Sequence, residues 1–168
     1  MNEDLIGALV KVASTRAEGQ WPEQLDLDVF HRFLRDPAPA AALIDDVAVA
    51  RHARDLLAAV LVDGTDAEAR SALNSVAATY AVVPRIDGNG PYFLSLSGTA
   101  EGAFWAQILA DLMQAVSEGC RARVGRCVSA PCIMPFLDTS TAGVREFCSV
   151  RCATRARVRR HRSKEGSS

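Results

Sequence analysis

The chain has 168 residues, of which 49% are hydrophobic, and its formal net charge is −1 at pH 7. A chain of this size can bury one sizeable core together with a small appendage. No apolar stretch approaches the roughly 20 residues that a membrane-spanning helix needs, and the acidic start, Met1-Asn2-Glu3-Asp4, does not resemble a secretory signal. These features exclude a membrane-spanning protein and predict a cytoplasmic one.

Apolar residues at helical spacing predict four helices in the first half of the chain. These helices cover residues 4–17, 25–34, 45–62 and the segment from Thr65 to about Thr79. Asp45 and Asp46 suit the start of the third helix through capping and the helix dipole. Thr65 and Glu68 form a capping-box pattern at the start of the fourth.

A β-hairpin and a fifth helix complete the N-terminal part. Two β-rich segments, 80–86 and 91–96, flank the glycine-bearing turn sequence Asp87-Gly88-Asn89-Gly90. Helical spacing returns over residues 99–119. We therefore predict a mainly α domain over residues 1–120, with a small β-hairpin at about 80–97, which is an α+β fold.

Four of the five cysteines lie close together near the C-terminus, as Cys127-x4-Cys132 and Cys148-x3-Cys152. Two close pairs about fifteen residues apart suit a single tetrahedral zinc site. Four protein ligands leave no open coordination position, so we expect one structural zinc ion. The alternatives are four unligated thiols and an iron–sulfur cluster. Cys120 is the one cysteine outside this pattern. Because the other four have the spacing of metal ligands and not of a disulfide framework, they indicate a reducing compartment.

The charge of the chain changes sign near residue 121. Residues 1–120 carry eight Lys/Arg and seventeen Asp/Glu, a net charge of −9, whereas residues 121–168 carry eleven and three, a net charge of +8. Such asymmetry hints at nucleic-acid or membrane contact by the basic part. We place the domain boundary in the arginine-rich joint at 119–126 and predict a basic four-cysteine zinc finger over residues 121–168.

Local patterns also predict the elements of this finger. A knuckle turn holds the first cysteine pair, strands over 133–137 and 144–147 form a hairpin, and a helix carries Cys148 and Cys152. Two cysteines four residues apart share one helix face. This order resembles a treble clef, whose core is too small to fold without its metal.

The C-terminal sequence resembles the CGNR zinc-finger proteins. The matching residues are the two cysteine pairs, the stretch from Phe136 to Ser140, Gly143, Arg145, Arg155, His161 and Arg162. These bacterial proteins are described as stress-responsive transcription regulators, and they join the finger to an N-terminal ABATE domain, which is α-rich with a small hairpin. In the tetrapeptide that names the family, Ala153 and Thr154 replace Gly and Asn here.

Arginines continue along the helix that follows the last cysteine. The planar guanidinium fork suits phosphate, and few aromatic residues are placed to stack RNA bases. We therefore expect DNA binding by the arginines of the finger, which are Arg145, Arg151, Arg155, Arg157, Arg159, Arg160 and Arg162. The alternatives are RNA binding, a solvated charged helix and a helix docked on the acidic N-terminal domain.

Together these patterns predict a bacterial, nucleoid-associated transcription regulator whose N-terminal domain acts as a sensor or binds a partner. The alternative is a protein-interaction adaptor whose basic finger docks an acidic protein. An unknown small-molecule effector and a homodimer fit the same scheme. Because the sequence contains no nucleophile elbow, phosphate loop or catalytic dyad, we do not expect this protein to be an enzyme.

Overall fold

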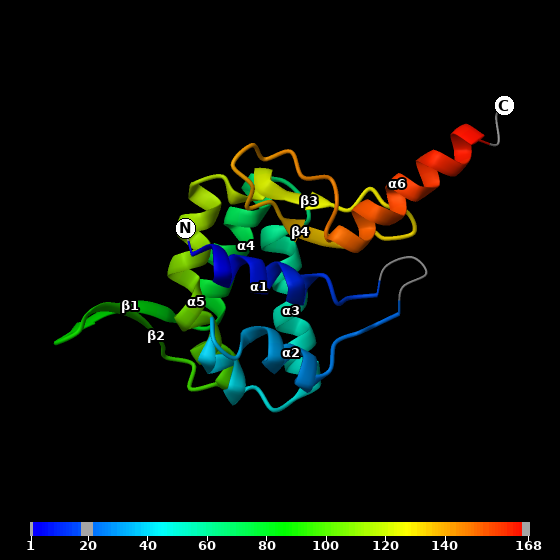
Figure 1. Cartoon of the computed structure of the whole chain (residues 1–168). Coiled ribbons are helices and arrows are strands. Elements are labelled where there is room, and N and C mark those ends of the chain that lie inside the picture. Colours follow the sequence, from blue (N-terminus) through cyan, green and yellow to red (C-terminus); the bar gives the residue numbers. More distant parts are fainter. Residues whose placement is uncertain (1, 18–21, 166–168) are drawn as a thin grey trace.

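The computed structural model describes residues 2–17 and 22–165. Within them lie six α-helices, two short 3-10 helices and two antiparallel two-stranded sheets (Figure 1). The α-helices are α1 (Glu3–Ala13), α2 (Leu27–Leu34), α3 (Val47–Leu61), α4 (Asp66–Thr79), α5 (Ala100–Ser117) and α6 (Val150–Glu165). The other elements are β1 (Val82–Asp87), β2 (Gly90–Ser95), β3 (Val124–Arg126), β4 (Pro135–Leu137), η1 (Pro39–Leu43) and η2 (Cys120–Arg123). The predicted α+β class is confirmed, and no helix of the described residues is long and apolar enough to span a bilayer.

The first five α-helices bury one hydrophobic core. Its largest fully buried side chains are Trp105, Phe30 and Phe104. The ring centroids of Phe30 and Phe104 lie 5.8 Å apart, and those of Phe104 and Trp105 lie 5.4 Å apart. Burial of each such side chain stabilises the fold by roughly 1.5–3 kcal/mol. α1 packs against α2, α3 and α5 and also against β4, so the first helix lies between the core and the C-terminal part.

Local side chains set where α3 and α4 begin. The Asp46 carboxylate accepts a hydrogen bond from the Ala48 amide at 2.7 Å. Thr65 and Glu68 form the predicted capping box, with each side chain accepting from the other residue's backbone N–H. An N-cap of this kind contributes about 1 kcal/mol. The sequence signals for these two helix starts are therefore confirmed.

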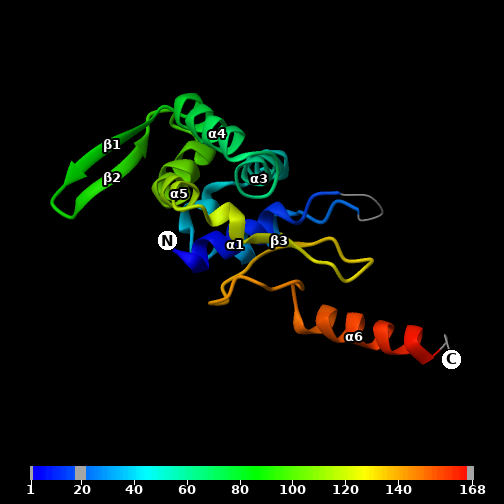
Figure 2. The ribbon, with the colours of Figure 1, turned by 90° about the horizontal axis from the view of Figure 1, so that it is seen from above.

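The predicted N-terminal hairpin is formed by β1 and β2. The two strands pair antiparallel, from Val82 opposite Ser95 to Asp87 opposite Gly90. The hairpin packs on α5 at its base, and its tip extends away from the helices (Figure 2). The turn is tightened by the Asp87 carboxylate, which accepts from the backbone N–H of Asn89 at 2.7 Å.

The sheet of the finger differs from the predicted one. β4 pairs with β3, and residues 144–147 form no strand. The cause is the buried carboxylate of Asp138, which accepts from the backbone N–H groups of Ser140 and Arg145 at 2.9 and 2.8 Å. These bonds hold the intervening chain in a loop. Residues 144–147 then run beside the knuckle, where the Val128 N–H donates to the Glu146 carbonyl at 3.1 Å.

The finger packs directly against the helical body. β4 lies on α1, and Leu137 belongs to the same buried cluster as the helices. The Arg121 side chain is only 9% exposed and donates to the main-chain carbonyls of Val60, Asp63 and Gly64 at 2.5, 2.6 and 2.6 Å. η2 is therefore fastened to the C-terminal end of α3, so the joint is held by specific contacts.

The last helix stands apart from this assembly. In both views α6 extends away from the body formed by α1 to α5 (Figures 1 and 2). Its anchoring contacts go to the knuckle turn of the finger, through Arg155 and Arg159. The arginine-rich helix is thus not laid against the acidic N-terminal helices, which was one of the alternatives open from the sequence.

Candidate metal centre and nucleic-acid interface

Two turns and the start of a helix bring four cysteines together. Cys127 directly follows β3, and Cys132 closes the knuckle turn, where its backbone N–H donates to the Ser129 carbonyl at 2.9 Å. Cys148 precedes α6 and Cys152 lies in its first turn. The end of β3, the knuckle turn and the start of α6 therefore bring the four predicted ligands together.

The sulfur atoms have the spacing of a tetrahedral site. All four Sγ atoms lie within 4.8 Å of one another. The Sγ–Sγ distances are 3.7 Å for Cys132 and Cys148 and 3.6 Å for Cys148 and Cys152. A Zn–S bond of about 2.3 Å gives a tetrahedron with edges of about 3.8 Å. Thiolates favour zinc over hard cations, so the residues fit one structural zinc ion with all four positions taken.

The thiols differ in acidity when no metal is bound. Burial raises the pKa of Cys148 to about 12 and also raises the pKa of Cys132. Hydrogen bonding with Ser149 lowers the pKa of Cys152 to about 7. Since zinc binds thiolates, loading the site at neutral pH must release protons.

Arg155 and Arg159 bond to the metal site and to the knuckle turn. The Arg155 guanidinium donates to the Cys152 sulfur at 3.2 Å and to the hydroxyl and carbonyl of Ser129 at 3.2 and 3.1 Å. Arg159 donates to the Ala130 carbonyl at 2.7 Å. Both arginines therefore tie α6 to the knuckle, and an N–H···S bond supports the Cys152 thiolate. The sequence pattern, which assigned both arginines to nucleic acid, did not reveal these partners.

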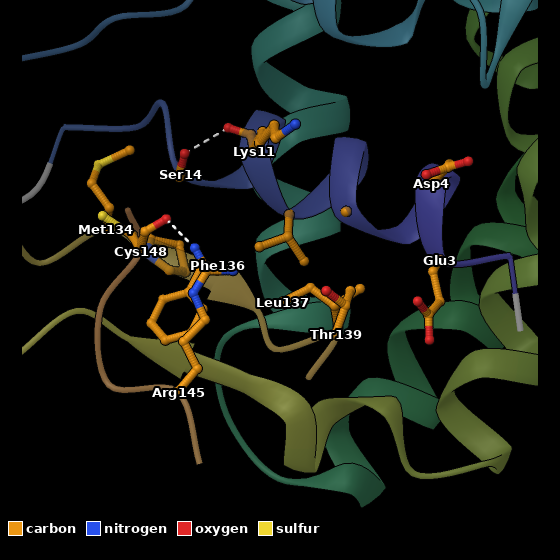
Figure 3. A pocket seen from close by; sticks show the side chains of 13 residues that line it. Glu3, Asp4, Lys11, Ser14, Met134, Phe136, Leu137, Thr139, Arg145 and Cys148 are labelled. Carbon is orange, nitrogen blue, oxygen red and sulfur yellow. Dashed lines mark hydrogen bonds between the residues drawn. The ribbon is translucent and has the colours of Figure 1, made fainter. Parts of the chain in front are cut away.

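Arg145 orders the segment that leads to the third cysteine. Its guanidinium donates to the carbonyls of Phe147 and Cys148 at 2.7 and 2.6 Å and lies 5.1 Å from the ring centroid of Phe136 (Figure 3). Its backbone N–H is held by Asp138. Asp138 is thus a structural residue of the site whose role the sequence did not reveal. The available signal was an acidic residue directly after the apolar β4.

A groove of about 490 Å³ is lined by residues of both α1 and the finger (Figure 3). Its α1 side carries Glu3, Asp4 and Lys11, and its finger side carries Phe136 and Arg145. Both charge signs therefore line one opening. A molecule seated there would touch the helical body and the finger at once.

The other arginines of α6 face solvent. The exposed members of the predicted nucleic-acid set on this helix are Arg151, Arg157, Arg160 and Arg162. Within the part of the chain that the structure describes, none of their guanidinium groups has a protein partner. The predicted set of seven is thus divided into three arginines with structural bonds, of which Arg145 and Arg159 are also exposed, and four exposed arginines without such bonds.

Comparison with known families agrees with this geometry. Residues 123–165 match the family model of the CGNR zinc finger. The matched segment spans β3 to α6 and includes all four cysteines. The chain therefore contains a zinc finger, a metal-binding module that holds one structural zinc ion. No curated protein matches the chain.

Proposed function

We propose that this protein binds DNA through its zinc finger and acts as a bacterial transcription regulator. The observation that carries the proposal is the set of four exposed arginines, Arg151, Arg157, Arg160 and Arg162, that make no bond to the described part of the protein, on a helix that extends away from the acidic body (Figure 2). Guanidinium groups that face solvent suit the phosphates of a nucleic acid. The activity we propose is binding and not catalysis.

The charge distribution of the chain favours approach of DNA from the side of the finger. The net charge is −9 over residues 1–120 and +8 over residues 121–168. Four thiolates around one Zn²⁺ contribute about −2, which leaves the finger at about +6. DNA is repelled by the body and attracted by α6, so the helix meets the duplex first.

The metal has an indirect part in this function. Zinc would hold Cys148 and Cys152 against the knuckle, and Arg155 would complete the attachment of α6 to the knuckle. A helix fixed in this way presents its arginines in one orientation, which lowers the entropy lost on binding. The zinc-loaded finger is therefore the DNA-binding form.

The helical body would provide the sensor or the partner-binding surface. The order of helices and hairpin in the N-terminal part resembles that of an ABATE domain. That resemblance implies a role in stress response. α1 contacts β4, so a ligand or partner on α1 has a short physical route to the finger. The groove beside α1 is open to such a ligand (Figure 3).

A salt titration tests the proposal. Fluorescence anisotropy with a labelled duplex should give an affinity that falls steeply with salt, at about −0.9 in log–log slope for each phosphate contacted. The triple substitution of Arg151, Arg160 and Arg162 to Ala should flatten that slope by up to about 3 units. A matched control removes three exposed arginines of the body, Arg35, Arg70 and Arg85, and should not weaken binding.

The same experiment separates the two functions that the sequence left open. Failure of the zinc-loaded protein to bind duplex DNA at low salt would reject DNA binding. In that case an acidic protein would be the better candidate partner for the finger. Equal loss of affinity in the two triple variants would mean that attraction is unspecific and that α6 is not the contact.

A further inference from the structure

The orientation of α6 on the finger is fixed by one of its faces. Cys152, Arg155 and Arg159 follow one another at i, i+3 and i+7, and all three bond to the metal site or the knuckle. Two residues advance a helix by about 200°, so the residues two positions further on lie on the opposite face. These are Thr154, Arg157 and His161, and all three are exposed.

The outward face has a different chemistry from its two edges. A hydroxyl, a guanidinium fork and an imidazole lie along its centre. One edge carries Arg151 and Arg162, which are eleven residues, or about three turns, apart, and the other edge carries Arg160. Charge therefore lies on both sides of a strip whose side chains form directional hydrogen bonds.

This arrangement matches the cross-section of a DNA major groove. α6 has 16 residues, a length of about 24 Å, and it extends free of the body (Figures 1 and 2). A major groove about 12 Å wide admits one helix. Arginines on both edges of such a helix meet the two phosphate walls, and the strip between them meets the base edges. The deep, narrow major groove of an RNA duplex does not admit a helix in this way.

We infer that α6 is a recognition helix for specific duplex DNA, in which Arg157 and Thr154 contact bases and Arg151, Arg160 and Arg162 contact phosphates. The inference rests on the proposed DNA binding. Arg157 is placed to donate both arms of its fork to O6 and N7 of a guanine, and the Thr154 hydroxyl contacts a neighbouring base pair. Arg155 and Arg159 are positioning residues that set the angle of the helix.

Selection from a randomised duplex library tests the inference. The zinc-loaded wild type should enrich a motif that contains at least one strongly preferred guanine. Arg157→Lys keeps the positive charge but loses the fork, so preference for that guanine should fall by about 5- to 150-fold while the salt dependence stays unchanged. Arg70→Lys, at an exposed arginine of the helical body, is the matched control and should keep both the motif and the salt dependence. Thr154→Val should alter preference at one adjacent base pair only.

The outcomes distinguish this inference from the function on which it rests. Salt-dependent binding without any enriched motif would overturn base recognition and leave DNA binding intact. An Arg157→Lys variant that enriches the wild-type motif with undiminished guanine preference would also overturn it. Failure of the wild type to bind any duplex would reject the proposed function, and the inference with it.

Discussion

Replacement of Arg121 by Ala should loosen the finger from the helical body. This side chain is almost fully covered and gives its donors to three carbonyls at the end of α3 and in the following turn. It also pairs with Asp66, whose carboxylate is 61% exposed. Ala keeps the helical propensity of the segment and removes all of these bonds, so the change isolates the joint.

The size of the effect follows from the environment of each bond. The bonds to Val60 and Asp63 are partly buried, and a hydrogen bond from a charged donor contributes about 1.5 kcal/mol or more. The Gly64 carbonyl is exposed and can bond to water, and the exposed ion pair to Asp66 contributes little. The expected loss is about 3 kcal/mol in the free energy of unfolding, or about 6–12 °C in melting temperature for a chain of this size.

Thermal unfolding with zinc present throughout would measure this loss. Arg160→Ala is the control, because it removes an exposed arginine and should change stability by no more than about 0.5 kcal/mol. Arg121→Lys should recover only part of the loss, since an ammonium cannot reach all the acceptors. Equal melting temperatures for Arg121→Ala and Arg160→Ala would refute the claim that Arg121 joins the two parts.

Three further predictions concern the metal site. Cys148→Ala should lose stoichiometric zinc and the ordered finger while α1 to α5 keep their helical circular dichroism; zinc retained at one per chain would contradict the four-thiolate assignment. Zinc binding at pH 7 should release roughly three to four protons, because the pKa of Cys148 is raised by burial and zinc binds thiolates. Calorimetry in buffers of different ionisation enthalpy measures this release. Zinc affinity should therefore fall as pH falls, and an affinity independent of pH would refute this prediction. Arg155→Ala should weaken zinc binding by about 10- to 100-fold in chelator competition, whereas Arg157→Ala should leave it unchanged, and equal affinities would remove Arg155 from the site.

Features set by neighbours in the sequence could be predicted. The capping box of Thr65 and Glu68, the cap at Asp46 and the β1–β2 hairpin follow from residues a few positions apart. The convergence of the four cysteines was also predictable, since one ion imposes the same geometry on any chain that binds it. Residues 123–165 match the zinc-finger family by this same pattern.

Features set by contacts far apart in the sequence could not be predicted. The pairing of β4 with β3 depends on a loop held by the buried carboxylate of Asp138. The bonds of Arg155 to Ser129 span 26 residues, and those of Arg121 to Val60 span 61. Composition shows that a segment is rich in arginine, but only such contacts decide which arginines make structural bonds and which do not.

DNA binding by zinc-loaded and zinc-stripped protein is the measurement that tests the central claim most directly. Anisotropy titrations of one labelled duplex at low salt would compare the two forms, followed by return of one equivalent of zinc. The account predicts tight binding with zinc, a loss of at least tenfold in affinity without it, and recovery on reloading. Equal affinity of the two forms would contradict the claim that the four-thiolate zinc site positions α6 for DNA.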